Sequence, residues 1–213
     1  MNCIYLKLTD TNWTAIDQLL LSYTSENRAE NVLAYKFDKD KKLALYADLL
    51  AQMYLSILTG KPTKAIQVKY QKNRKPSSNS GLDFSFAHSE DSILLSIVQK
   101  GVTGADLELV ANPPFEVMDM VFSKNECAYI DTAKEGAYDR FFEMWTRKEA
   151  YTKALGYGLI TDLTSISTAD TKLSDSLFTW RESAYLCSVY SSDDKKFNKI
   201  ISKESEVIKF FLE

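Results

Sequence analysis

Histidine and cysteine are scarce in this sequence of 213 residues. His88 is the only histidine, which argues against a histidine-rich metal site. The three cysteines, Cys3, Cys127 and Cys187, are odd in number and widely spaced, so they predict neither a disulfide framework nor a zinc-binding spacing. Unpaired cysteines are typical of a reducing compartment, and we therefore expect a cytoplasmic protein.

Several other signals are also absent. No apolar run approaches the length of a bilayer span, and the N-terminus has no basic segment followed by a long apolar core, so neither a membrane helix nor a signal peptide is expected. The formal net charge of −3 gives no reason to expect a nucleic-acid partner. A Gly-x-Ser-x-Gly nucleophile elbow is missing, which argues against a serine hydrolase.

Composition and hydrophobic patterning predict a folded core. Hydrophobic residues make up 45% of the chain and charged residues 26%, as in ordinary globular proteins. A long helix, apolar on almost every side, is predicted to start at a cap formed by Asp38 or Asp40 and to end before Gly60. The other expected helices cover residues 115–133 and 138–155, and the expected strands cover residues 3–8, 65–70, 92–98, 102–110, 164–168, 177–181, 185–190 and 207–211.

The order of these elements indicates two similar halves. Helices followed by antiparallel hairpins occur twice, which predicts an α+β fold with two lobes. We expect an N-terminal lobe over residues 1–101 and a C-terminal lobe over residues 102–213. A cleft between two lobes is a common place for an active site, and the junction near Gly101 is close to the most unusual strand of the sequence.

That strand carries two carboxylates. In the stretch G-A-D-L-E-L-V, residues 104–110, Asp106 and Glu108 are two positions apart and therefore share one face of a strand. Like charges on one face repel each other and need water, a cation or a base to neutralise them. The alternative to a functional pair is a solvated edge strand.

Two further groups precede this strand. Lys69, Lys72, Arg74 and Lys75 form a basic cluster that suits a phosphate group, although a solvated loop would look the same. In F-A-H-S, residues 86–89, His88 is either a donor to an anion, an acid–base group or a structural histidine.

The third group is W-T-R-K-E-A-Y-T-K-A-L-G-Y-G-L, residues 145–159. On a helix Glu149 and Lys153 share a face, which is also the spacing of an ordinary stabilising pair, and Thr146 with Glu149 matches a capping box. The functional interpretation makes Glu149 a third carboxylate beside Asp106 and Glu108. Three carboxylates with phosphate oxygens and water suit Mg²⁺, which prefers oxygen ligands.

Taken in chain order, these motifs resemble those of one family. Lys-Pro at 75–76, His-Ser at 88–89, the Asp-x-Glu pair and the segment at 145–159 are similar to the motif series of the Sfp-type 4′-phosphopantetheinyl transferases. The segment F-S-K-N-E, residues 122–126, also resembles a short stretch that the family carries between the acidic pair and its last motif. The resemblance runs from about residue 28 to 159, and it implies a pseudo-dimer of two α+β lobes with coenzyme A in the cleft between them.

The resemblance also implies an activity. Enzymes of this family transfer the phosphopantetheine arm of coenzyme A to a serine hydroxyl of an apo acyl, peptidyl or aryl carrier protein and release 3′,5′-adenosine bisphosphate. By this resemblance Asp106, Glu108 and Glu149 match the Mg²⁺ ligands. Glu149 also matches the base for the incoming serine, so two roles compete for one carboxylate, and Lys153 matches the lysine that faces the pyrophosphate.

Other matches concern coenzyme A and the carrier. Lys75, His88 and Arg28 match residues that hold the 3′-phosphate and adenine end of coenzyme A. The family usually has Ser, Gly and a basic residue at the positions that Ala87, Arg74 and Asn31 occupy here. Carrier docking is expected on apolar residues of the second lobe within 113–121, with Met118 and Val121 as test positions, and a monomer is expected because one chain supplies both lobes.

Two other readings of the sequence remain. A catalytically weak coenzyme A-binding or carrier-docking protein would bind coenzyme A without transferring its arm. A Mg²⁺-dependent phosphohydrolase would use water in place of serine and would release adenosine bisphosphate without a carrier.

Overall fold

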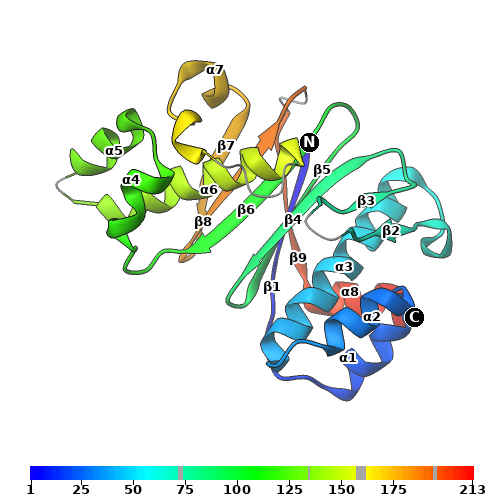
Figure 1. Ribbon diagram of the computed structural model, residues 1–213. Coiled ribbons are helices and arrows are strands. Elements are labelled where there is room, and N and C mark those ends of the chain that lie inside the picture. The colour runs from blue at the N-terminus through cyan, green and yellow to red at the C-terminus, as the bar shows by residue number, and fades with distance from the viewer. Residues whose placement is uncertain (72–73, 134, 157–161, 194–195) are drawn as a thin grey trace.

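The computed structural model describes residues 1–71, 74–133, 135–156, 162–193 and 196–213. Two groups of helices flank a central region in which strands of two sheets lie side by side (Figure 1). The first half of the chain contains, in order, β1 (Asn2–Lys7), α1 (Ala15–Leu20), the short 3-10 helix η1 (Leu21–Tyr23), α2 (Glu26–Leu33), α3 (Asp38–Thr59), η2 (Thr63–Ala65), β2 (Val68–Lys69), β3 (Ser77–Ser78), β4 (Asp83–Ser89) and β5 (Ser92–Val98).

In the second half a long helix packs on an antiparallel sheet. Its elements are β6 (Thr103–Leu109), η3 (Phe115–Val117), α4 (Met118–Val121), α5 (Lys124–Asp131), α6 (Ala137–Leu155), η4 (Leu163–Ser165), α7 (Thr171–Ser174), β7 (Leu177–Glu182), β8 (Tyr185–Ser191), β9 (Asn198–Lys203) and α8 (Glu204–Leu212). Helices and sheets thus make up an α+β fold, as the sequence predicts. That the two halves are a pseudo-dimer stays a prediction.

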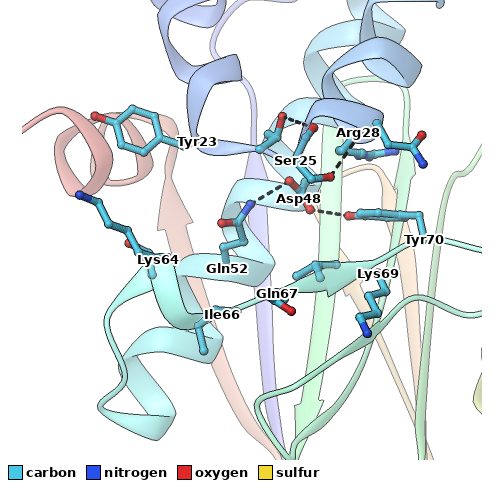
Figure 2. Close-up of a pocket in the computed structure, with 14 residues that line it drawn as sticks. Tyr23, Ser25, Arg28, Asp48, Gln52, Lys64, Ile66, Gln67, Lys69 and Tyr70 are labelled. Atoms are coloured by element: carbon cyan, nitrogen blue, oxygen red, sulfur yellow. Dashed lines mark hydrogen bonds between the residues drawn. The ribbon is translucent and has the colours of Figure 1, made fainter.

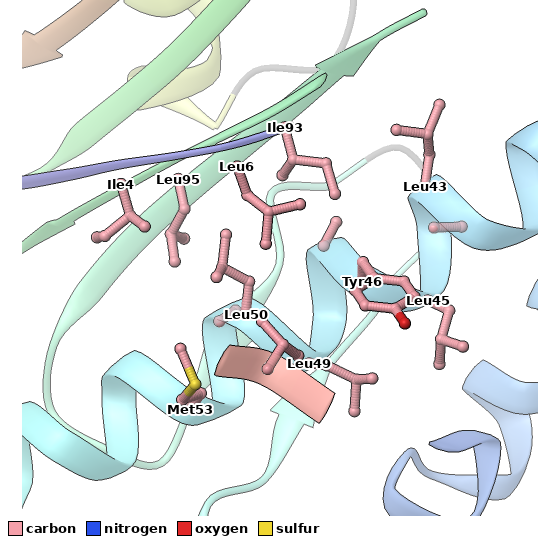
Figure 3. Close-up of a cluster of buried hydrophobic side chains, with 14 of the residues drawn as sticks. Ile4, Leu6, Leu43, Leu45, Tyr46, Leu49, Leu50, Met53, Ile93 and Leu95 are labelled. Atoms are coloured by element: carbon pink, nitrogen blue, oxygen red, sulfur yellow. The ribbon is translucent and has the colours of Figure 1, made fainter. Parts of the chain in front are cut away.

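The N-terminal sheet has the strand order β4-β5-β1-β9, and α3 packs on one of its faces. Alternating residues of β1 and β5, such as Ile4 and Leu95, point toward α3 because side chains of a strand alternate between faces. Figure 3 shows Leu49, Leu50 and Met53 of α3 meeting this face of the sheet. The predicted long helix is therefore central to the core, although its N-cap is Phe37 and Asp38 is its first residue.

The opposite face of the same sheet joins the two halves of the molecule. Cys3 and Tyr5 of β1 and Leu94 of β5 belong to a second apolar cluster that includes Leu107 of β6 and Cys187 of β8. The C-terminal sheet has the order β6-β8-β7, and all its neighbouring strands are antiparallel. One apolar layer therefore lies between the sheets, so the site at their junction rests on a rigid base.

The edges of the two sheets are also tied by polar contacts. The backbone N–H of Ala105 donates to Ser85 Oγ at 3.1 Å, and the hydroxyls of Ser96 and Thr103 are 2.9 Å apart. The backbone N–H of Thr103 donates to Asp83 Oδ2 at 2.7 Å. These contacts join β4 and β5 to β6, and they fix the position of the Asp-x-Glu strand relative to the strand that carries His88.

The C-terminal end of the chain returns to the first lobe. Strand β9 pairs in parallel with β1, with Asn2 opposite Asn198 and Lys7 opposite Lys203, and α8 places Val207 and Phe211 in the core beneath α3 (Figure 1). The predicted boundary between residues 101 and 102 places β9 and α8 in the second lobe, whereas both elements pack in the first. The strand expected over 207–211 is wrong, because this apolar stretch is part of helix α8.

We expect Phe211→Ala to lower the free energy of unfolding by about 3–5 kcal/mol, although Phe211 is only two residues from the end of the sequence, because its ring is buried in the core. Its neighbour Phe210 is 39% exposed and provides a matched control, for which Phe210→Ala should cost about 1 kcal/mol or less. Urea unfolding of both variants measures the difference. Equal losses would mean that α8 is not part of the cooperative core.

Other predicted elements also differ from the structure. The strand expected over 65–70 is limited to β2 (Val68–Lys69), because the preceding residues form η2 (Thr63–Ala65). Residues 164–168 do not form a strand, since η4 covers Leu163–Ser165 and Thr168 serves as a hydrogen-bond partner of Glu126. The predicted helix over 115–133 is divided into η3, α4 and α5, because Ser123 caps a new helix there. None of the helices in the described residues is both long and apolar enough to span a membrane.

Candidate active site

Strand β6 presents its two carboxylates toward helix α6. Ala105 and Leu107 point into the apolar layer between the sheets, so Asp106 and Glu108 must occupy the other face. The shared face that the sequence predicts is therefore present. The face is not a freely solvated edge, because Asp106 is only 4% exposed and α6 covers it.

Gly104 is the reason that α6 can approach this strand so closely. A Cβ atom built at Gly104 would lie 1.8 Å from the carbonyl oxygen of Ala150, which no side chain can tolerate. With glycine at this position, the stripe of α6 that contains Trp145, Glu149 and Lys153 lies over the carboxylates of β6.

A cavity of about 400 Å³ opens where β4, β6 and α6 meet. Five residues singled out in the sequence line it: His88, Asp106, Glu108, Glu149 and Lys153. The side chains of Phe86, Ala87 and Trp145 complete the lining. The structure thus brings together, in one place, residues as far apart in the chain as His88 and Lys153.

Asp106 and Lys153 form the central ion pair of this cavity. Lys153 Nζ is 2.5 Å from Asp106 Oδ1. Burial raises the pKa of Asp106 to about 7; the Lys153 charge opposes this shift, and the neighbouring Glu108 and Glu149 charges add to it. Burial lowers the pKa of Lys153, but the charge and hydrogen bond of Asp106, together with the charges of Glu149 and Glu108, outweigh burial and hold that pKa above its ordinary value.

Glu108 and Glu149 complete the acidic group. Burial raises the pKa of Glu108, while a hydrogen bond from Ser89 Oγ to Glu108 Oε2 at 3.0 Å opposes the shift. The capping-box alternative for Glu149 is wrong, since Thr146 lies in the middle of α6 and its hydroxyl contacts Ser188 Oγ at 2.8 Å. Within the described residues Lys153 pairs with Asp106 and makes no ion pair with Glu149.

His88 stands on β4 at the side of the cavity. Partial desolvation lowers its pKa, and the charges of Lys153 and Arg28 lower it further. The imidazole is therefore neutral near pH 7 and can donate one hydrogen bond.

Lys75 does not line this cavity. Its ammonium group donates to Asp83 and, at 2.6 Å, to the carbonyl oxygen of Thr103, at the junction of the two sheets. Burial lowers the pKa of Lys75, and the contact with Asp83 opposes that shift. Lys72 and residues 157–159 of the last motif lie outside the described residues.

Arg28 lines a different cavity, of about 490 Å³, between α2, α3 and β2 (Figure 2). Its guanidinium lies 4.3 Å from the ring centroid of Tyr70, and Nη2 donates to the carbonyl oxygen of Ala44 at 2.6 Å. Tyr70 and Gln52 both donate to the buried carboxylate of Asp48. Arg28 therefore has structural partners, and its link to the first cavity is its electrostatic effect on His88.

The donor set of the first cavity fits a divalent cation. Asp106 Oδ2 is buried without a hydrogen-bond partner in the described part of the chain, so one oxygen has a free lone pair. Asp106, Glu108 and Glu149 provide only oxygen donors, which Mg²⁺ prefers. Among the residues that the structure covers, no three His, Cys, Asp or Glu side chains are arranged to hold a metal ion, and Lys153 occupies Oδ1 of Asp106.

Sequence reasoning did not single out every residue of the site. Trp145 lies one helical turn before Glu149 on the same stripe of α6, a spacing that could have indicated its place in the cavity. Asp83, which binds Lys75 and the backbone of Thr103, has no such signal in the sequence.

One expected docking position is also corrected. Met118 is only 8% exposed and packs in a small cluster with Phe122 and Phe141, so a charge there would disturb folding before it tested docking. Met120, two residues later, is 68% exposed.

Comparison with known proteins agrees with this geometry. A family model described as "4'-phosphopantetheinyl transferase superfamily" matches residues 103–208. The chain is 25% identical over 163 residues to the 4′-phosphopantetheinyl transferase Gsp of Aneurinibacillus migulanus. The aligned region covers 76% of this chain and 68% of that protein. It is 32% identical over 95 residues to the 4′-phosphopantetheinyl transferase AcpT of Salmonella typhi and of Salmonella typhimurium, covering 42% of this chain and half of each AcpT sequence.

The fold and the acidic cavity are those of an enzyme rather than of a purely structural protein. The family match assigns residues 103–208 to the 4′-phosphopantetheinyl transferase superfamily.

Proposed function

We propose that this chain transfers the 4′-phosphopantetheine arm of coenzyme A to a serine hydroxyl of an apo carrier protein in a Mg²⁺-dependent reaction. The observation that carries the proposal is the convergence of Asp106, Glu108, Glu149 and Lys153 on one cavity at the junction of the two sheets. The names of the relatives support the same activity in general.

The three carboxylates would hold the magnesium ion in this cavity. When bound, the ion would neutralise charge on the pyrophosphate of coenzyme A. Lys153 would then break its contact with Asp106 Oδ1, so that Asp106 is available to the ion. Its ammonium group would contact the phosphate that becomes the leaving group. This change needs only a rotation of the flexible lysine side chain.

The transfer itself needs a base and a leaving group. We assign the base to Glu149, whose carboxylate faces the cavity and would accept the proton of the serine hydroxyl, directly or through a water. The serine oxygen forms a bond to the phosphorus atom that carries the pantetheine arm. The bond from that phosphorus to the bridging oxygen breaks, and the oxygen leaves as part of 3′,5′-adenosine bisphosphate.

Three further residues would position coenzyme A. His88 would donate a hydrogen bond to its phosphate from the wall of the cavity. Lys75 would bind a phosphate oxygen of coenzyme A only after its ammonium group releases Asp83. Arg28 would add favourable charge from the neighbouring cavity while it remains stacked on Tyr70.

The compartment and the oligomeric state belong to the same proposal. Cys127 and Cys187 carry free thiols, which is compatible with a reducing cytoplasm. The cavity draws its lining from both sheets of one chain, so a monomer would be sufficient for catalysis.

Intact-protein mass spectrometry tests the proposal. We expect an apo carrier mixed with this chain, coenzyme A and Mg²⁺ to gain the mass of one phosphopantetheine group. Chelation of the metal by EDTA should abolish the gain and excess Mg²⁺ should restore it, while a carrier whose acceptor serine is replaced by alanine should gain nothing.

Other outcomes would favour the alternatives. Coenzyme A binding without transfer to any carrier would indicate a binding protein. Adenosine bisphosphate released at the same rate without a carrier would indicate a phosphohydrolase.

A further inference from the structure

Strand β6, which carries the acidic pair, lies at the edge of its sheet, whose order is β6-β8-β7. The backbone N–H of Ser192 donates to the carbonyl oxygen of Val102. Eight residues further along β6, the backbone N–H of Val110 donates to the carbonyl oxygen of Ala184. The main-chain groups of the even-numbered residues therefore point to β8, and those of the odd-numbered residues point away from it.

Two side chains on one face of β4 bind this open edge. Asp83 Oδ2 accepts a hydrogen bond from the backbone N–H of Thr103 at 2.7 Å. Ser85 Oγ, two residues later, accepts one from the backbone N–H of Ala105 at 3.1 Å. Both contacts are made to the main chain of β6, so they fix the distance between the strands and leave the side chains of β6 free to rotate.

The same face of β4 has a different contact at its far end. Residue 87 is alanine, whose side chain has no acceptor, and it packs with Leu107 in the apolar layer between the sheets. Two residues later, Ser89 Oγ donates to Glu108 Oε2 at 3.0 Å. At this end β4 therefore binds a carboxylate that lines the active cavity instead of the main chain.

The turn that follows Ser89 is tied to the sheet that carries Glu108. Glu90, at a positive φ of 54°, and Asp91 connect β4 to β5. Tyr185 of β8 donates its hydroxyl to Asp91 Oδ1 at 2.7 Å. Since β8 is the neighbour of β6, the end of β4 is held against the C-terminal sheet, and the Ser89 hydroxyl has a defined place beside Glu108.

A second donor reaches Glu108 from helix α6. Burial raises the pKa of Glu108, whereas the hydrogen bonds from Ser89 and Trp145 favour its charged form and oppose the shift. Donors on a carboxylate that binds a metal limit its rotation and direct its remaining lone pairs. The hydrogen bonds of Glu108 thus act on its orientation as well as on its charge.

On the basis of the proposed function, we propose that Ser89 is a positioning residue that orients the Glu108 carboxylate for the magnesium ion. Its hydroxyl occupies one lone pair of Oε2 and limits rotation of the carboxylate, which keeps other lone pairs for the ion. Ser89 belongs to the first lobe and Glu108 to the second. The affinity for the metal therefore depends on how the two lobes are packed.

Metal binding tests this inference. Ser89→Ala should weaken the binding of Mn²⁺, a paramagnetic substitute for Mg²⁺, by about tenfold in a titration followed by the EPR signal of the free ion. The apparent KM for Mg²⁺ in carrier modification should rise by the same factor. Coenzyme A affinity measured without metal should not change, because Ser89 acts through Glu108. Ser89→Thr keeps the hydroxyl and should restore the affinity for Mn²⁺.

Ser85→Ala is the matched control, since it makes the same change on the same face of β4. Ser85 is only 3% exposed and holds the backbone N–H of Ala105, so its loss should lower stability to urea at least as much as Ser89→Ala does. Its affinity for Mn²⁺ should nevertheless equal that of the unmodified chain. Equal weakening of Mn²⁺ binding in both variants would show that Ser89 has only a structural role.

The two proposals fail in different ways. Transfer by Ser89→Ala with an unchanged dependence on Mg²⁺ and unchanged Mn²⁺ affinity would overturn the role of Ser89 and leave the proposed function intact. Absence of transfer by the unmodified chain to any apo carrier would contradict the proposed function. In that case the Mn²⁺ titrations of Ser89→Ala and Ser85→Ala would still decide whether Ser89 orients Glu108 for a metal ion.

Discussion

Replacing Asp106 by asparagine should reduce the rate of phosphopantetheine transfer by about 100- to 1,000-fold. The amide keeps the size of the side chain but removes the buried anionic oxygen that has no partner in the described residues. It also leaves Lys153 without the carboxylate that fixes its ammonium group. Initial rates of carrier modification, measured with saturating Mg²⁺ and coenzyme A, provide the test.

This variant should remain folded, because burial already disfavours the charged form of Asp106 and the side chain of its partner Lys153 is 34% exposed to water. Burial is the largest effect on Asp106, and with the charges of Glu108 and Glu149 it outweighs the attraction of Lys153 and raises the pKa to about 7. Asp139→Asn is the matched control. Asp139 pairs with Arg181 on the exposed surface, so its replacement should leave the rate of transfer unchanged. A fully active Asp106→Asn protein would show that this carboxylate plays no part in the reaction.

Replacing Glu126 by glutamine should lower the free energy of unfolding by about 3–5 kcal/mol. Glu126 is completely buried, and its carboxylate lies 2.7 Å from the ammonium group of the equally buried Lys148. The same carboxylate accepts hydrogen bonds from the backbone N–H groups of Ser123 and Thr168. The variant leaves Lys148 as a buried cation without its counter-ion, and urea unfolding measures the cost.

Two comparisons make this prediction specific. Glu143→Gln removes a partly exposed pair with Arg147 on α6 and should cost about 1 kcal/mol or less. The double variant E126Q/K148M should be more stable than E126Q alone, because no unpaired charge remains buried. If E126Q were as stable as Glu143→Gln, the buried pair would have no net role in stability.

The pH dependence of stability follows from the same pair. Burial opposes ionisation of Glu126, but Lys148 and the hydrogen bonds outweigh it and hold its pKa below the ordinary value of 4.5. The ionised carboxylate therefore contributes stability above pH 4.5, and this contribution is lost as the pH falls through the lower folded-state pKa. The difference between the natural protein and E126Q should shrink in that acidic range.

Local periodicity was enough to predict the acidic strand and the helix above it. The two-residue spacing of Asp106 and Glu108 and the four-residue spacing of Glu149 and Lys153 fix which side chains share a face. The distance between these elements is not contained in either pattern. It depends on Gly104, whose missing side chain lets α6 approach β6.

Other features could not be predicted because their partners lie far away in the sequence. The stretch over 207–211 is a short apolar run, and its hydrophobic periodicity does not distinguish a helix from a strand. It forms a helix because Val207 and Phe211 pack in the core beneath α3. Glu126 and Lys148 are ordinary surface residue types whose pairing arises only when α5 packs on α6.

The return of the chain to the first lobe has a consequence for biosynthesis. The N-terminal amine donates to the carbonyl oxygen of Lys196, and β9 becomes the outermost strand beside β1. In topological terms, the second lobe is inserted between β5 and β9 of the first. A ribosome therefore releases the whole second lobe before it releases the strand and helix that complete the first, so the lobe begun first is the one finished last.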